Sequence, residues 1–273
     1  PCNHQGKTPP CSDLLVHHQV KRVVIGCVDS FEKVAGKGIE KLRSAGIDVI
    51  TNVLEKECRE INKRFFTFHE KKRPYIFLKW AQTKDGFISR NKEDIKGNNN
   101  WITCEESKTL VHQWRSEEAA ILVGTNTAKA DNPALNNRYW IGGKLPIILV
   151  IDKHLQLDQS LQLFNQEQRT IVFNFLKNEV DRNVQYIQLN LNEDVITQIL
   201  TACYQQNIQS IIIEGGAKLL QSFIDKQLWD EARVITNQDL MVNEGLNAPA
   251  FSGELIEEEK IFSDSIQYFI PGT

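Results

Sequence analysis

The 273-residue sequence lacks several features that would each place it in a particular class of protein. No apolar run approaches the roughly 20 residues that a membrane-spanning helix needs. The first residues are polar, with neither the basic start nor the apolar stretch of a signal peptide. The six cysteines are scattered along the chain, unlike those of a small secreted disulfide scaffold. We therefore expect a cytoplasmic protein with reduced thiols and no membrane partner.

The sequence also lacks an excess of positive charge. Its formal net charge is −3, whereas a protein that binds a nucleic-acid backbone normally carries a basic excess. We therefore predict no nucleic-acid partner. With 41% hydrophobic and 25% charged residues, the composition is that of an ordinary globular protein, and the length is sufficient for two domains.

An initial methionine is missing as well. The chain starts at Pro1 and enters a dense motif at its second residue, although natural domains seldom start inside a functional loop. A missing N-terminal segment is the simplest explanation, and we expect one.

Strand and helix patterns alternate in two series, separated by a charged stretch at residues 70–73 and by Pro74. The residue before a proline disfavours helix, so this is a good domain boundary. The first series, in residues 1–70, amounts to part of an α/β layer. Its predicted elements are strands at Val20–Asp29 and Asp48–Thr51 and helices at Lys37–Ala45 and Lys56–Glu70.

The second series, residues 74–273, predicts one α/β domain with helices covering a mixed or parallel sheet. Helices are expected at Glu105–Glu118, Asn192–Gln206 and Ala217–Lys226. Strands are expected at Tyr75–Ala81, Ala120–Gly124, Pro146–Asp152, Thr170–Phe175, Val184–Gln188, Ser210–Glu214, Glu231–Thr236 and Ile266–Ile270.

The opening motif PCNHQGKTPPC places Cys2 and Cys11 around a turn rich in glycine and proline. Two thiolates in a constrained loop suit a tetrahedral zinc site, but zinc deaminases usually have the tighter P-C-x-x-C. On spacing alone, two unpaired cysteines beside a surface turn are the better interpretation. The sequence contains no H-x-E motif, because neither His4, His17 nor His18 is followed two residues later by glutamate.

The segment SIIIEGGAKLLQSFI (Ser210–Ile224) predicts a buried strand, a Gly-Gly turn and an apolar helix. Such a turn places backbone N–H groups and a helix N-terminus at the carboxyl end of a strand, where phosphate binds well. A tight turn that needs small residues only for packing explains the segment equally well. The second domain has no G-x-G-x-x-G, so a Rossmann fingerprint is not supported.

Several of these strings, in order, resemble the bifunctional deaminase–reductase of riboflavin biosynthesis. In the first domain they are PCNHQGKTPPC and Val34–Val49; in the second they are Arg73–Ser89, Asn99–Thr103, Trp114–Arg138 and IIIEGGAKLL. The resemblance implies a partial cytidine-deaminase-like α/β layer followed by a dihydrofolate-reductase-like α/β domain. It also implies a homo-oligomer and, in the longer parent protein, a multifunctional enzyme whose hydrolase activity is a zinc-dependent deamination.

The resemblance also assigns residues. Cys2 and Cys11 would be zinc ligands, the third ligand and the proton-shuttling glutamate lying in a preceding H-x-E motif. Substrate contacts would come from Asn99, Arg115, Leu135, Arg138 and Glu214, and the catalytic carboxylates would be Asp131 and Glu214. NADPH contacts would come from Ala81, Trp101, Thr127, Asp131, Gly216, Ala217, Lys218, Leu219, Leu220, Gln221 and Ser222.

Each assignment has a structural alternative. Arg115 would equally pair with Glu118 three residues on, and Arg138 would be an exposed solubilising arginine. Asp131 would cap a helix, Glu214 would make a strand-end hydrogen bond, and Trp101 would anchor the core.

The resemblance implies that the chain uses NADPH to reduce 5-amino-6-(5-phosphoribosylamino)uracil, a small phosphoribosylaminopyrimidine, to the ribitylamino product. Two alternatives stay open: reduction of a pterin or another pyrimidine, and a domain that binds a nucleotide without catalysis.

The incomplete zinc motif gives a first prediction. Two cysteines provide neither enough ligands to hold zinc firmly nor the base that activates its water. Purified alone, this 273-residue chain should bind less than stoichiometric zinc by metal analysis and release no ammonia from the aminopyrimidine. Stoichiometric zinc together with ammonia release would contradict this expectation.

Overall fold

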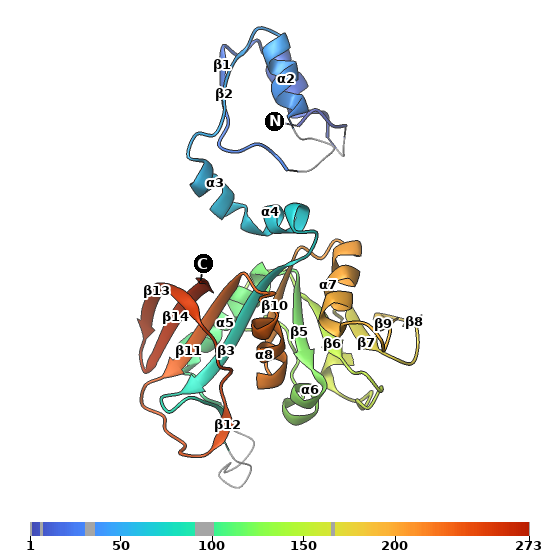
Figure 1. Ribbon diagram of the computed structural model, residues 1–273, viewed down its shortest axis with the longest axis vertical. Helices are drawn as coiled ribbons and strands as arrows, with labels where there is room; N and C mark the ends of the chain where they lie inside the picture. The colour runs from blue at the N-terminus through green and yellow to red at the C-terminus, as the bar shows by residue number, and fades with distance from the viewer. Residues whose placement is uncertain (1, 6–7, 31–35, 91–100, 165–166, 273) are drawn as a thin grey trace. The chain divides into compact units, whose positions relative to one another are not determined.

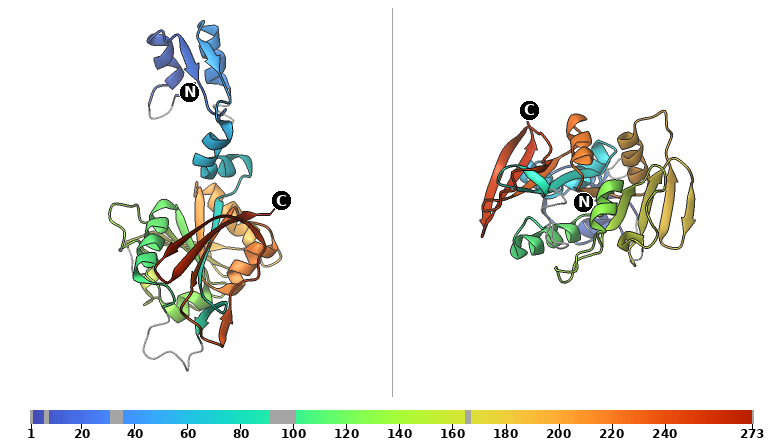
Figure 2. Two further views of the ribbon diagram at one scale, coloured as in Figure 1. Left: turned by 90° about the vertical axis from the view of Figure 1, so that its left-hand side faces the viewer. Right: turned by 90° about the horizontal axis from the view of Figure 1, so that it is seen from below.

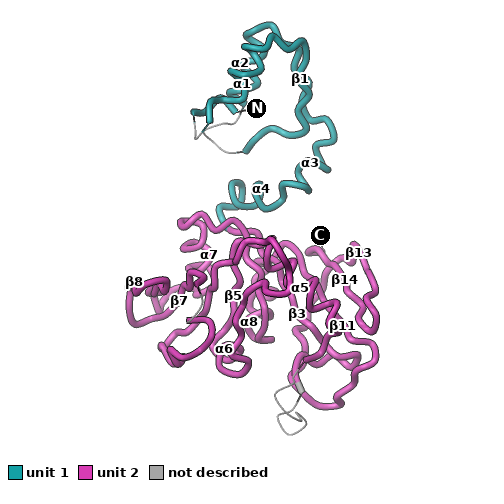
Figure 3. The backbone as a smooth tube through the Cα atoms, turned by 180° about the vertical axis from the view of Figure 1, so that it is seen from behind, with its two compact units in different colours: residues 1–73 teal, residues 74–273 magenta. Residues whose placement is uncertain are grey.

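The computed structural model describes residues 2–5, 8–30, 36–90, 101–164 and 167–272. The chain divides into two compact units, Pro1–Arg73 and Pro74–Thr273, which are coloured separately in Figure 3. Each unit contains both helices and strands.

In the first unit, two short strands, β1 (Arg22–Val24) and β2 (Asp48–Ile50), pair in parallel. The helices are α1 (Cys11–His17), α2 (Lys37–Ser44), α3 (Glu55–Ile61) and α4 (Lys63–Glu70). The single helix predicted at Lys56–Glu70 is wrong, because Asn62 leaves helical geometry with φ −107° and ψ 22°. Ile61, an apolar residue at the end of α3, is 82% exposed.

The second unit contains a sheet whose strands lie in the order β13-β14-β11-β3-β10-β5-β6-β7-β9-β8 within the described residues (Figure 1). The strands from β11 to β9 run parallel to their neighbours, and β14, β13 and β8 add antiparallel edges. The central strands are β3 (Tyr75–Thr83), β5 (Ala120–Gly124), β6 (Ile147–Ile151), β7 (Thr170–Asn174), β9 (Val184–Gln188), β10 (Ser210–Glu214) and β11 (Glu231–Asn237). The edge strands are β8 (Glu179–Asp181), β13 (Gly253–Ile261) and β14 (Asp264–Pro271), and β4 (Phe87–Arg90) pairs with β12 (Gly245–Asn247) outside this sheet. The predicted mixed sheet is therefore confirmed.

Helices cover both faces of this sheet (Figure 2). Helices α7 (Val195–Gln205) and α8 (Ala217–Asp225) pack on one face, and α5 (Glu105–Glu117) and α6 (Thr125–Asp131) pack on the other. Because β10 is buried on both faces, its sequence is a continuous apolar run that ends in one charged residue, Glu214. The short 3-10 helix Gln162–Phe164 contributes Leu163 and Phe164 to the core.

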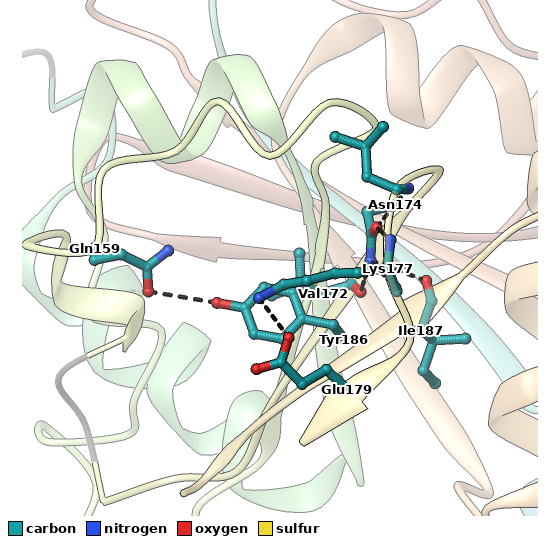
Figure 4. A network of polar contacts seen from close by, with 8 residues as sticks. Gln159, Val172, Asn174, Lys177, Glu179, Tyr186 and Ile187 are labelled. Carbon is teal, nitrogen blue, oxygen red and sulfur yellow. Dashed lines mark hydrogen bonds and ion pairs between the residues drawn. The ribbon is translucent and has the colours of Figure 1, made fainter. Parts of the chain in front are cut away.

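A group of polar contacts lies around the ends of β7, β8 and β9 (Figure 4). The side-chain amide of Asn174 donates to the carbonyls of Val172, Lys177 and Ile187 at 3.0–3.3 Å, which closes the turn after β7. The ammonium group of Lys177 lies 3.0 Å from Glu179 and 3.8 Å from the centre of the Tyr186 ring. These contacts hold the short edge strand β8 against β9.

The N-terminus of α7 gives a prediction about stability. The Asp194 carboxylate caps this helix by accepting from the Thr197 N–H at 2.9 Å, and it also pairs with Lys226 at 2.8 Å. Asp194→Ala should lower the free energy of unfolding by ~1 kcal/mol, whereas Asp194→Asn keeps a capping oxygen and should cost only a few tenths. Urea denaturation monitored by circular dichroism measures both. Equal losses would show that the ion pair, rather than the cap, dominates.

Candidate active site

The carboxyl ends of two neighbouring parallel strands define the candidate site. Strand β10 ends at Glu214 and β5 ends at Gly124, and the two strands pair directly. Helix α8 begins three residues after Glu214, and α6 begins directly after Gly124. In open α/β sheets, ligands bind at the carboxyl ends of the strands.

Arg115 and Glu214 form a buried, bidentate ion pair at the carboxyl end of β10. The Nε of Arg115 donates to Glu214 Oε1 at 2.7 Å, and its Nη2 donates to Oε2 at 2.6 Å. Their side chains are only 13% and 9% exposed. Pairing of Arg115 with Glu118, the alternative drawn from the sequence, is therefore wrong, since Glu214, 99 residues away in sequence, is the partner. The strand-end hydrogen bond expected for Glu214 exists, but it goes to a charged side chain.

Lys79 joins this pair, and the sequence reasoning missed it. It lies in β3 directly beside Glu214 in the sheet register. Burial lowers the pKa of Lys79, while the Glu214 charge opposes that shift and the Arg115 charge adds to it. The sequence does contain a signal for Lys79, a single lysine inside the otherwise apolar run YIFLKWA. A buried strand rarely carries a charged residue without a functional reason.

Glu214 is held as a carboxylate. Burial alone would raise its pKa, but the charge and hydrogen bonds of Arg115, helped by Lys79 and His112, bring that pKa well below its ordinary value. Glu214 therefore cannot donate a proton near neutral pH. It can orient Arg115 and balance the charge of Lys79.

Arg115 also shapes the loop that follows α6. Its Nη1 donates to the backbone carbonyl of Asn136 at 3.1 Å, and Asn136 Oδ1 accepts from Arg138 at 2.9 Å. Leu135 has a φ of +49°, and the buried Gln168 amide fixes its carbonyl at 3.1 Å. The Leu135 side chain is buried in the core, so any contact of this residue with a ligand goes through its backbone. Arg138, in the same loop, is exposed to solvent.

The Gly215–Gly216 turn fits a phosphate group. Both glycines have positive φ values, +86° and +75°, which other residues rarely adopt. A Cβ at Gly215 would lie 2.8 Å from Thr127 Cγ2, so the turn brings α6 and the start of α8 together only because it lacks side chains. No side chain caps α8, which leaves N–H groups of its first turn available to an anion. Gly216, Ala217 and Lys218 are the residues of this turn that would hold a cofactor phosphate.

The remaining α8 residues assigned to the cofactor are occupied within the protein. Leu219 and Leu220 are buried in the core, and both their N–H groups donate to the Gly216 carbonyl. The Gln221 side chain bonds with the backbone of Ala250 in both directions, and the Ser222 hydroxyl donates to the Lys218 carbonyl. The polar side-chain groups of Gln221 and Ser222 therefore already have partners within the protein, and the assignment of these four residues to the cofactor stays a prediction.

The other assigned residues differ in their element and in how far each is buried. Ala81 lies farther along β3, half-buried. Asp131 is the last residue of α6, and partial burial of its carboxyl group raises its pKa. Trp101 is 46% exposed, which excludes the core-anchor alternative. Asn99 lies outside the described residues.

The two cysteines of the opening motif do not make a zinc site by themselves. The Cys11 N–H donates to Cys2 Sγ at 3.5 Å and lowers the pKa of Cys2, which favours a thiolate. Cys2 also lines a cavity of about 340 Å³ in the first unit, beside Cys27 and Asp29. Within the described residues, however, no group of three or more His, Cys, Asp or Glu side chains is placed to hold a metal. Two cysteine ligands alone do not fit a zinc ion.

A model of the RibD C-terminal domain matches residues 74–241, which include Lys79, Arg115, Glu214 and the Gly-Gly turn. The chain belongs to the RibD family. It is 38% identical to the riboflavin biosynthesis protein RibD of Aquifex aeolicus over 264 residues, covering 94% of this chain and 72% of that protein. It is 36% identical to RibD of Actinobacillus pleuropneumoniae, covering 80% of this chain and 60% of the relative.

A solved structure extends the family likeness to the fold. The diaminohydroxyphosphoribosylaminopyrimidine deaminase/5-amino-6-(5-phosphoribosylamino)uracil reductase of Thermotoga maritima is 31% identical, with a TM-score of 0.88. The likeness covers 100% of this chain and 77% of that one. The expected relationship to a reductase of riboflavin biosynthesis is thus confirmed, and this chain spans only part of the length of its RibD relatives.

The buried ion pair predicts a specific pattern of stability. Glu214→Gln leaves Arg115 charged and without its carboxylate, which should cost about 3–5 kcal/mol of unfolding free energy. The double variant Arg115→Met with Glu214→Leu removes both charges of the pair, and Lys79, whose pKa burial already lowers, can then lose its proton. This variant should therefore recover most of that loss. Denaturant titration of the single and double variants measures the difference. If the double variant were as unstable as Glu214→Gln, the pair would not be the source of the effect.

Proposed function

We propose that this chain is an NADPH-dependent reductase of riboflavin biosynthesis that converts 5-amino-6-(5-phosphoribosylamino)uracil to its ribitylamino product. The observation that carries the proposal is the grouping of Lys79, Arg115 and Glu214 beside the Gly215–Gly216 turn at one edge of the sheet. The Thermotoga maritima relative is named as a reductase of this substrate.

The cofactor would bind along the edge formed by the Gly-Gly turn, Thr127 and the first turn of α8. NADPH, when bound, supplies a hydride. The protein positions the sugar so that its C1 lies within reach, and this alignment is the main contribution that a hydride-transfer site makes. We also propose Ala81, Trp101 and Asp131 as contacts to the cofactor.

The substrate side would be formed by Arg115, Arg138 and the backbone of Leu135. When the ribosylamine ring opens, the C1–N bond becomes an imine; C1 accepts the hydride and the nitrogen accepts a proton. We assign that proton to Lys79, because its lowered pKa makes an ammonium group in this position a better acid than an exposed lysine. Glu214 stays ionised and stabilises the positive charge on the imine nitrogen.

On the family resemblance, we also propose a cytidine-deaminase-like fold for the first unit and zinc-dependent deamination in a longer parent protein. We likewise propose a cytoplasmic location and a homo-oligomer. No helix among the described residues is long and apolar enough to cross a membrane.

The experiment is NADPH oxidation followed by absorbance, with the phosphoribosylaminouracil, a pterin and a second pyrimidine offered separately. Oxidation with the first substrate alone supports the proposal. A preference for the pterin would favour the alternative reductase, and NADPH binding without oxidation of any substrate would favour a non-catalytic nucleotide-binding domain.

Lys79 gives the sharpest variant. Lys79→Met removes the acid and should lower kcat by ~100-fold or more. In the wild type, kcat should fall as the pH rises through the pKa of Lys79, because the protonated form is the active one. The exposed Lys84→Met, five positions along the chain, is the matched control and should leave kcat unchanged. Equal effects of the two variants would remove Lys79 from the mechanism.

A further inference from the structure

A short segment before α5 is held by side chains that lie far along the chain. Ile102 and Cys104 stand between Trp101, a proposed cofactor contact, and the start of α5. The side-chain amide of Asn237 donates to the Ile102 carbonyl at 2.7 Å, and the Asp264 carboxylate accepts from the Cys104 N–H at 2.9 Å. These bonds span 135 and 160 residues of sequence, so they fasten the segment to a distant part of the domain.

The sheet fixes the two side chains that hold this segment. Asn237 is the last residue of β11, and its register partner Asp264 is the fully buried first residue of β14. The Oδ1 atom of Asn237 accepts from the N–H groups of Asp239 and Leu240 at 3.0 and 3.1 Å. Because two donors point at Oδ1, the amide has one satisfied orientation, in which its NH₂ group faces Ile102.

The held segment lies at the same end of the sheet as the ion pair. Strand β3 lies between β10 and β11 (Figure 1), and all three strands run parallel. Glu214, Thr83 and Asn237 are the last residues of β10, β3 and β11. Asn237 therefore fastens the segment to the carboxyl ends of parallel strands, where a cofactor would bind.

Trp101 is the exposed part of this held segment. It is 46% exposed, whereas its neighbour Ile102 is buried. The Lys108 ammonium lies over the Trp101 ring, 4.7 Å from its centre, which leaves the opposite ring face for a flat ligand. A ring that is held in place before a ligand arrives loses less entropy on binding than a mobile ring does. The fastened backbone therefore favours binding at Trp101.

We infer that Asn237 is a positioning residue that sets the affinity for NADPH through Trp101. Its amide holds the Ile102 carbonyl, and this keeps the Trp101 ring in the place where it contacts the cofactor. Asn237 acts without touching the cofactor or the substrate. The contact between Trp101 and NADPH rests on the proposed function.

Asn237→Asp tests this hold with a small change. Aspartate keeps an acceptor for the loop after β11, but its carboxylate has no donor for the Ile102 carbonyl. The Kd for NADPH, measured by fluorescence titration of the full chain, should rise about tenfold, which corresponds to the cost of ordering the freed segment. Asn183→Asp is the matched control, because the half-buried Asn183 likewise donates to a backbone carbonyl, that of Gln168, at 3.0 Å. It should leave the Kd unchanged.

A second variant covers a failure to fold. If circular dichroism shows that Asn237→Asp is unfolded, Asn237→Ser gives the same test without a new charge. Its hydroxyl still accepts from the turn after β11 but is too short to reach Ile102. An unchanged Kd for NADPH in the folded variant would overturn the inference.

Trp101→Ala provides the readout that a general loss of stability would not change. This variant removes the ring that Asn237 positions, so adding Asn237→Asp to it should change the Kd for NADPH little further. A rise of about tenfold on adding Asn237→Asp both to the wild type and to Trp101→Ala would show that Asn237 acts by another route, and it would overturn the inference.

Turnover separates this positioning role from the chemistry. Asn237→Asp should raise KM for NADPH about tenfold and leave kcat at saturating NADPH within about twofold of the wild type. A loss of kcat with KM for NADPH unchanged would contradict a role through cofactor affinity. Normal NADPH binding by Asn237→Asp would leave the reductase proposal standing, whereas a wild type that bound no NADPH would overturn the proposed function and this role together.

Discussion

The ion pair between Arg115 and Glu214 organises the region in which the chemistry is proposed. It joins the middle of the domain, at the end of β10, to helix α5, and through the Asn136 carbonyl it also holds the loop after α6. Because both carboxylate oxygens are occupied, Glu214 is kept ionised beside Lys79. Burial lowers the pKa of the Lys79 ammonium, and the charge of Glu214 opposes that shift.

Two parts of the proposed site adjoin this ion pair. The Gly215–Gly216 turn and the uncapped start of α8 offer backbone N–H groups to a cofactor phosphate. In the proposed reaction, the other part of the site would place the reacting C1 of the sugar near Lys79 and Glu214.

The sequence predicts correctly those parts of the fold that local residue patterns determine. The bounds predicted for β5, β9 and β10 are those observed, because each is a short run of strand-forming residues closed by a turn. It missed α6, whose sequence TNTAKAD buries only Ala128 and has no apolar period, and β13, which is exposed on both faces. Both elements are defined by their neighbours in space, and local sequence carries little of that information.

The same distinction applies to the site. Glu214 was assigned through family likeness, but its pairing with Arg115, distant in sequence, emerges only from the fold, as does the position of Lys79 beside it. The most direct test of the account follows the hydride itself. NADPH deuterated at its transferable position should, with this chain and the phosphoribosylaminouracil, give a ribitylamino product that carries one deuterium at the sugar-derived C1. A product formed without deuterium, or NADPH left unchanged with intact substrate, would contradict it.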